Sequence, residues 1–77
     1  MLKIKDVLAL RRKELKISQK SLSEKTSISV VSLVKYEKGE RLPSFENLNR
    51  LATALHLDYD ELCDALMQEK KQRKQEN

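Results

Sequence analysis

The apolar residues of the chain recur at the spacing of three and four positions that is typical of amphipathic helices. The clearest stripe lies between residues 45 and 55, where Leu48, Leu51, Ala52 and Leu55 would share one side of a helix. The same pattern predicts an all-α chain of five helices. They span about Lys3–Lys16, Gln19–Lys25, Val30–Lys38 and Phe45–Leu55, and the fifth begins after Asp58 and carries Leu62 and Leu66 inward.

The starts of the helices are marked by residues whose side-chain oxygen can accept a first-turn N–H group. Each of these residues stands directly before a segment with helical spacing. They are Ser18, Ser29, Ser44 and Asp58. The single glycine, Gly39, and the single proline, Pro43, enclose the one strongly marked loop.

One segment, residues 29–34 (SVVSLV), has the β-branched composition of a strand. A strand needs a partner to satisfy its backbone groups, and the chain has no second run of this composition. We therefore predict a helix here.

The length of 77 residues fits one small domain, which we place at residues 1–67. A core of this size supplies about 3–5 kcal/mol, so we expect support from a partner chain. Residues 68–77 have no apolar side chain. We expect them to form a basic polar tail, as a frayed helix end or a disordered segment.

Charge is unevenly distributed along the chain. Residues 1–41 have eleven Lys and Arg against five Asp and Glu, residues 42–69 have one Arg against six acids, and residues 70–77 have four bases against one acid. A basic first half followed by an acidic segment indicates a surface directed at a polyanion, and double-stranded DNA is one candidate partner.

Several other classes of protein are disfavoured. The chain has one cysteine, Cys63, and one histidine, His56, so we expect no disulfide, no metal site and no Ser-His-Asp triad. We expect no cofactor and no enzymatic activity, because the chain has no paired catalytic carboxylates and no phosphate-binding glycine loop. The apolar runs are too short for a membrane span, so we expect a soluble, cytoplasmic chain.

A short helix, a tight turn and a second helix form the helix-turn-helix arrangement. The run Ile17-Ser18-Gln19, with Leu22 and the later Tyr36-Glu37-Lys38-Gly39, resembles the Cro/phage-repressor class of helix-turn-helix DNA-binding domains. The resemblance extends over about Ile4–Leu66. It implies a five-helix repressor-like domain whose second and third helices form the helix-turn-helix.

This resemblance implies a sequence-specific transcription regulator of bacterial or phage type, acting as a repressor-like homodimer on a palindromic operator. The alternative is a protein-interaction module or an antitoxin that uses the valine-rich side of the third helix. The surface of dimerisation has two candidates: the fifth helix with Leu62, Leu66 and Met67, or the loop around Leu42 and Phe45.

The outward side of residues 30–38 is the candidate DNA-reading surface, since Leu33 and Tyr36 share the side that faces the core. Valine side chains there suit either thymine methyl groups or an apolar protein surface, and Lys35 suits guanine O6 and N7 or a phosphate. The family more often has Arg, Gln or Asn at these positions. With Ser29 before the helix, the set is Ser29, Val30, Val31, Ser32, Val34 and Lys35.

Other residues suit the phosphate backbone. The resemblance implies a phosphate contact for the amide of Gln19, at the start of the second helix, where N–H groups are unpaired. Three basic side chains are expected beside other phosphates, namely Lys20, Lys38 and Arg41.

The resemblance also implies a structural ion pair between Arg12 and Glu37, which would tie the first helix to the end of the third. Where the family often has glycine at helix ends, this chain has Lys16, Ser27 and His56. A left-handed backbone at these positions would cost strain.

Overall fold

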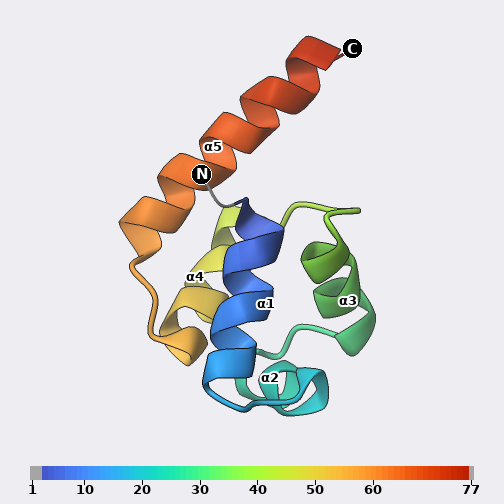
Figure 1. Ribbon diagram of the computed structural model, residues 1–77, viewed down its shortest axis with the longest axis vertical. Coiled ribbons are helices and arrows are strands. Elements are labelled where there is room, and N and C mark those ends of the chain that lie inside the picture. The colour runs from blue at the N-terminus through green and yellow to red at the C-terminus, as the bar shows by residue number, and fades with distance from the viewer. Residues whose placement is uncertain (1–2, 77) are drawn as a thin grey trace.

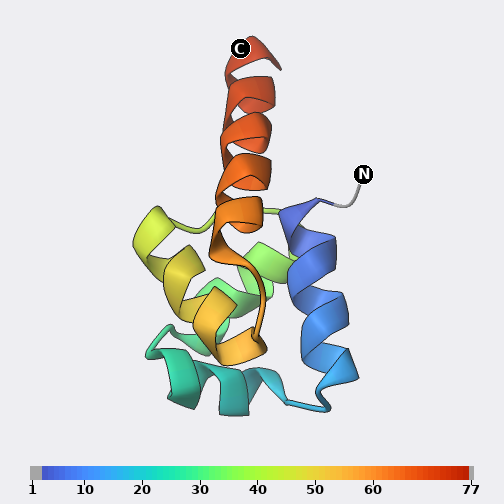
Figure 2. The same ribbon diagram turned by 90° about the vertical axis from the view of Figure 1, so that its left-hand side faces the viewer.

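The computed structural model describes residues 3–76 and consists of five α-helices, which confirms the predicted fold class (Figure 1). Helices α3 and α4 have the predicted limits, whereas α1 is shorter than expected at both ends and α2 is one residue longer. The helices are α1 (Ile4–Glu14), α2 (Gln19–Thr26), α3 (Val30–Lys38), α4 (Phe45–Leu55) and α5 (Tyr59–Glu76). Helices α1 to α4 pack together, and the second half of α5 extends beyond them (Figures 1 and 2).

All four predicted helix starts are confirmed by hydrogen bonds. In each case the side-chain oxygen accepts the N–H group of the residue three positions later, at 3.0–3.2 Å. The pairs are Ser18 with Ser21, Ser29 with Ser32, Ser44 with Asn47, and Asp58 with Glu61. Each such bond satisfies one of the N–H groups that a helix leaves unpaired at its start.

Three helices end with a non-glycine residue in the left-handed region of backbone conformation. Lys16 has φ 57°, Ser27 has φ 62° and His56 has φ 56°. At these three positions, where the resemblance led us to expect glycine, the backbone is left-handed although each residue has a Cβ. A left-handed residue with a Cβ costs about 1–2 kcal/mol. The end of α3 has glycine, with Gly39 at φ 78°.

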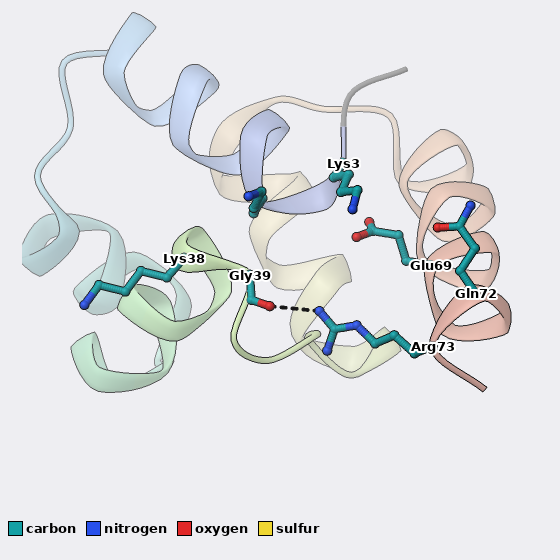
Figure 3. A pocket seen from close by; sticks show the side chains of 7 residues that line it. Lys3, Lys38, Gly39, Glu69, Gln72 and Arg73 are labelled. Carbon is teal, nitrogen blue, oxygen red and sulfur yellow. Dashed lines mark hydrogen bonds between the residues drawn. The ribbon is translucent and has the colours of Figure 1, made fainter. Parts of the chain in front are cut away.

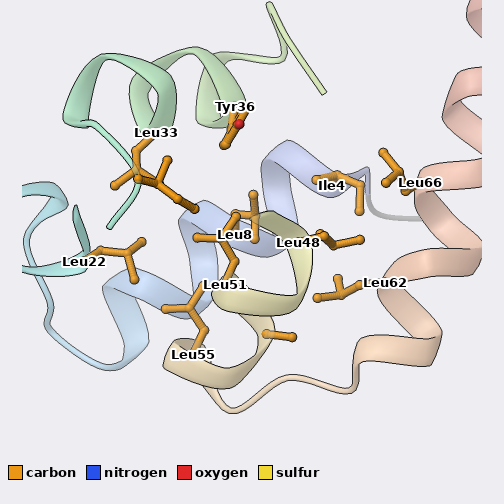
Figure 4. Close-up of a cluster of buried hydrophobic side chains, with 12 residues drawn as sticks. Ile4, Leu8, Leu22, Leu33, Tyr36, Leu48, Leu51, Leu55, Leu62 and Leu66 are labelled. Carbon is orange, nitrogen blue, oxygen red and sulfur yellow. The ribbon is translucent and has the colours of Figure 1, made fainter. Parts of the chain in front are cut away.

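The core collects buried side chains from every helix (Figure 4). Leu48, Leu51 and Leu55 of α4 are fully buried, as the apolar stripe predicted, and side chains of α1, α3 and α5 pack around them. The buried apolar set is Ile4, Leu8, Leu22, Ile28, Leu33, Tyr36, Leu48, Leu51, Ala52, Leu55, Leu62 and Leu66. Burial of one leucine side chain contributes about 1.5–3 kcal/mol, so this cluster is the main source of stability.

Helix α5 continues past residue 67 to Glu76, so of the two alternatives for the tail the structure has the helical one up to that residue. Its later turns are held by polar contacts. The Glu69 carboxylate accepts the N–H of Ile4 at 2.8 Å, and Arg73 donates to the carbonyl oxygen of Gly39 at 2.9 Å. The Lys70 ammonium lies 4.7 Å from the centroid of the Phe45 ring. Apolar periodicity carries no signal for contacts of this kind.

The buried positions also restrict where a second copy of the chain can dock. Leu62 and Leu66, expected as candidates for the dimer surface, are packed inside the core of their own chain. Met67, which is 51% exposed, and Phe45, which is 39% exposed, are the accessible apolar residues of the two candidate surfaces.

Two kinds of feature are absent from residues 3–76. No helix in this range combines the length and the apolar character that a bilayer span requires. Within the same range, no three His, Cys, Asp or Glu side chains lie close enough together to hold a metal ion. Cys63 is a free thiol and is half-buried.

The left-handed residue at the end of α4 gives a test of stability. We expect His56→Gly to raise the free energy of unfolding by about 0.5–1 kcal/mol, because removing Cβ relieves strain that exceeds the added entropy of the unfolded chain. The measurement is urea unfolding followed by circular dichroism. His56→Ala is the control, since it removes the imidazole and keeps Cβ. Equal stability of the two variants would contradict the prediction.

Candidate nucleic-acid interface

Helices α2 and α3 are joined by the three-residue turn Ser27–Ser29, and together they form the helix-turn-helix. The Thr26 hydroxyl donates to the carbonyl oxygen of Leu22 at 2.8 Å and accepts the N–H of Ile28 at 3.3 Å. Ile28 itself is buried in the core. The bond to Leu22 orients the Thr26 hydroxyl within α2, and the bond from Ile28 and the burial of that residue then hold the turn against the end of α2.

The outward side of α3 is open to solvent. Val31 is 66% exposed and Val30 is 38% exposed, and Lys35 is also exposed. Ser32 is half-buried. Leu33 and Tyr36 occupy the opposite side of the helix and are buried, as predicted. No segment of residues 3–73 covers the exposed positions, so the candidate reading surface is accessible.

The third valine differs from the expectation. Val34 is half-buried, so the side chains that stand out from α3 are those of Val30 and Val31. We use the name valine pair for Val30 and Val31 below. Val34 directly follows the buried Leu33, so it lies about 100° round α3 from that residue and not on the fully exposed side.

The hydroxyl groups of Ser29 and Ser32 are arranged as a pair at the start of α3. The Ser29 Oγ accepts the N–H of Ser32 at 3.1 Å, and its own proton is directed at the Ser32 Oγ, 3.0 Å away. The Ser32 hydroxyl accepts this bond and so keeps its proton available for an acceptor outside the chain. The start of α3 thus presents one free hydroxyl donor beside the valine pair.

The predicted ion pair between Arg12 and Glu37 is present and has a fork-to-fork geometry. The Arg12 Nε lies 2.8 Å from Glu37 Oε2, and Nη2 lies 3.0 Å from Oε1. The side chains are only 13% and 10% exposed. The pKa of Arg12 is raised above its ordinary value, mainly by the hydrogen bond with Glu37. Burial lowers this pKa, and the attraction of the Glu37 carboxylate raises it further.

Two further bonds extend this pair to the start of α2. The Arg12 Nη1 donates to the carbonyl oxygen of Ile17 at 2.9 Å, and the Gln19 Nε2 donates to Glu37 Oε1 at 3.2 Å. Gln19 therefore lies beside the last turn of α3. One of its two amide N–H groups is used by Glu37, and the other remains for a second acceptor.

The remaining basic residues predicted to contact phosphates lie at the edges of the helix-turn-helix. Lys20 is in the first turn of α2, Lys38 is the last residue of α3, and Arg41 is in the loop that follows. All three are exposed. Within the described residues none of them has a carboxylate oxygen within 4.0 Å, and the same is true of Lys35. These charges are available to an external anion.

Two contacts that position α3 were not expected from the sequence. The Asn47 side-chain amide donates to the Tyr36 hydroxyl at 3.0 Å, which connects α3 to α4. Arg73 bonds to Gly39 at the end of α3. The sequence contains a weak indication of the Asn47–Tyr36 bond, since a buried tyrosine requires a polar partner. It contains no indication of the Arg73–Gly39 bond.

The ion pair gives a test by mutation. We expect Arg12→Met or Glu37→Leu alone to lower the free energy of unfolding by roughly 3–5 kcal/mol, because each leaves one charge unpaired in a mostly buried position. The double variant should lose less than either single variant. The measurement is urea unfolding in a double-mutant cycle.

The exposed pair of Arg50 and Glu46, 2.9 Å apart, is the matched control. Its variants Arg50→Met and Glu46→Leu should change the free energy of unfolding by less than about 1 kcal/mol. Equal losses at the two pairs would show that the Arg12–Glu37 contact does not tie the helices together.

The geometry agrees with comparisons to known proteins. A family model described as helix-turn-helix matches residues 8–62. Over 62 residues the chain is 45% identical to the cryptic phage CTXphi transcriptional repressor RstR of Vibrio cholerae serotype O1 (strain ATCC 39315 / El Tor Inaba N16961). That match covers 80% of this chain and 55% of the relative, so the chain spans about half the relative's length.

A solved structure is similar along nearly its whole length. It is the crystal structure of the P22 c2 repressor protein in complex with synthetic operator 9T in the presence of Tl⁺. The TM-score is 0.75 with 34% sequence identity, and the match covers 80% of this chain and 94% of that one. The resemblance to phage repressors is thereby confirmed, and the chain belongs to the helix-turn-helix family.

Proposed function

We propose that the chain is a DNA-binding transcription regulator that acts as a repressor by binding operator DNA. The observation that carries this proposal is the open outward side of α3. The Arg12–Glu37 pair holds this helix in place, and lysine and arginine side chains without a carboxylate partner in the described part of the chain border it. The RstR repressor and the operator-bound P22 c2 repressor support it. The first is a transcriptional repressor and the second a repressor in complex with an operator, in agreement with a function that is not enzymatic.

In this proposal α3 lies in the major groove, which is about 12 Å wide and admits one α-helix. The residues at the start of a recognition helix lie closest to the base edges. The valine pair then meets thymine methyl groups, which are exposed only in the major groove. Ser32 donates its free proton to a base or a phosphate, and Lys35 contacts guanine O6 and N7 or a phosphate.

Val34 and Ser29 take smaller roles. Val34 is half-buried and offers only part of its side chain to the groove. The Ser29 hydroxyl is occupied by Ser32, so Ser29 contributes mainly by orienting that residue.

The phosphate contacts come from residues around the recognition helix. Gln19 donates its second amide proton to a phosphate at the start of α2, where the free N–H groups of the helix also favour an anion. Lys20, Lys38 and Arg41 neutralise further phosphates. Each contact of this kind steepens the salt dependence of binding by about 0.9 in a log–log plot.

We further propose that two copies bind together on a palindromic operator. Two recognition helices must then lie one helical turn of DNA apart, about 34 Å. Met67 and Phe45 are the exposed apolar side chains available to a second copy. A regulator of this kind works in the compartment that holds the genome, which for a bacterial or phage repressor is the cytoplasm.

A second candidate function is supported by the exposure of Val31. An apolar side chain that is two-thirds exposed on a helix also suits a protein partner, as in an interaction module or an antitoxin. The same surface cannot bind DNA and a protein at once. Selection of a particular DNA sequence by the chain therefore distinguishes the two functions.

The test is selection of bound duplexes from a random pool by the purified chain. We expect enrichment of an inverted repeat whose half-sites are about 10 base pairs apart, centre to centre. The control is Val31→Asp, which directs a carboxylate at the groove from an exposed position and should enrich nothing. If the unmodified chain enriches no sequence, the proposed function is wrong and the interaction module takes its place.

The selected operator allows a direct test of methyl recognition. Val31→Ala removes two carbon atoms, and with one of them buried against the thymine methyl group binding should weaken about fourfold, the equivalent of roughly 0.8 kcal/mol. On a duplex with deoxyuridine for thymine at the contacted position, the same variant should bind like the unmodified chain. The measurement is fluorescence anisotropy.

Lys35→Ala is the control, since removal of a charge should weaken binding equally on both duplexes. Equal losses for Val31→Ala on the thymine and deoxyuridine duplexes would contradict contact with the methyl group.

A further inference from the structure

A cavity of about 550 Å³ lies at the end of α3, between the start of α1 and the later turns of α5 (Figure 3). Its basic lining comes from Lys3, Lys5 and Arg73, with Glu69 and Gln72 beside them. Gly39 forms the floor, and a Cβ there would lie 2.8 Å from the Cδ of Lys5. The absence of a side chain at Gly39 therefore leaves room for the stem of Lys5.

The one carboxylate in this lining is already used. Helix α1 has no cap from its own first residues, and the Glu69 side chain supplies one by accepting the N–H of Ile4 at 2.8 Å. Arg73 uses part of its guanidinium to bond to Gly39, and the other N–H groups remain for a ligand. Within the described residues, neither Lys3 nor Lys5 has a carboxylate within 4.0 Å. The cavity therefore has an excess of positive charge.

The cavity and the proposed DNA surface have one residue in common. Lys38, the last residue of α3, lines its edge, and its ammonium group points away from Arg73 (Figure 3). When a recognition helix lies in the major groove with its start at the bases, its end approaches the phosphate backbone that borders the groove. A strand that passes Lys38 then comes next to the cavity.

We propose that this cavity, which we call the α5 phosphate site, binds a backbone phosphate of DNA that flanks the operator half-site. Arg73 provides a planar pair of N–H donors that matches two phosphate oxygens, and Lys3 and Lys5 provide point charges. The proposal rests on the proposed DNA-binding function. It concerns a part of α5 that lies beyond residues 8–62, the span of the family match.

The site also gives the later turns of α5 a role in presenting α3. Arg73 bonds to the carbonyl oxygen of the residue that ends α3, and the same guanidinium faces the phosphate. Binding of the flanking strand would hold α5, the end of α3 and the DNA together. The reading surface and the flanking contact are thereby coupled through one side chain.

The experiment compares two duplexes: the operator alone, and the operator extended by one helical turn at each end. For the unmodified chain, the slope of log Kd against log salt should be steeper on the extended duplex by about 0.9 for each flanking phosphate. For Lys3→Gln/Arg73→Gln the two slopes should be equal. Lys3→Gln alone, which removes no hydrogen bond of the fold, should show part of this loss.

The matched control is Lys13→Gln/Lys25→Gln, which removes two exposed charges outside the site and should preserve the difference between the duplexes. If Lys3→Gln/Arg73→Gln and Lys3→Gln both keep the full difference, the α5 phosphate site is wrong while the proposed function stands. If the unmodified chain binds neither duplex, the proposed function is wrong and the site is wrong with it.

Discussion

The buried contact of Arg12 with Glu37 is the interaction on which the arrangement of the helix-turn-helix depends. It joins α1 to the last turn of α3, and through Ile17 and Gln19 it includes the segment that begins α2. Two charged groups that are nearly removed from water must satisfy each other, and the fork geometry allows few relative positions of their helices. The outward side of α3 is therefore presented in one orientation, which is what recognition of a DNA groove requires.

The helices could be predicted from the sequence because their signals are local. A side-chain oxygen at Ser18, Ser29, Ser44 and Asp58 bonds within one turn, and the stripe of Leu48, Leu51 and Leu55 reports burial directly. The left-handed ends at Lys16, Ser27 and His56 had no such signal of their own. They were suggested by the glycines of related proteins, as was the pairing of Arg12 with Glu37, whose partners lie 25 positions apart.

The contacts of the later turns of α5 could not be predicted, for a physical reason. Glu69 and Arg73 bond to backbone groups of Ile4 and Gly39, which lie 65 and 34 positions away. Backbone groups are the same for every residue type, so the sequence carries no sign of which one a side chain will meet. The half-burial of Val34 could not be predicted for a related reason, because burial depends on tertiary packing that the local spacing of apolar residues does not report.

The proposed function requires that the outward side of residues 30–38 lies against a duplex groove. The most direct measurement is a titration of the ¹⁵N-labelled chain with its selected operator, followed by NMR through the backbone amide signals. The account predicts that the largest shifts belong to Val30, Val31, Ser32 and Lys35, with smaller shifts at the start of α2. Largest shifts on the exposed side of α4, with α3 unchanged, would contradict it.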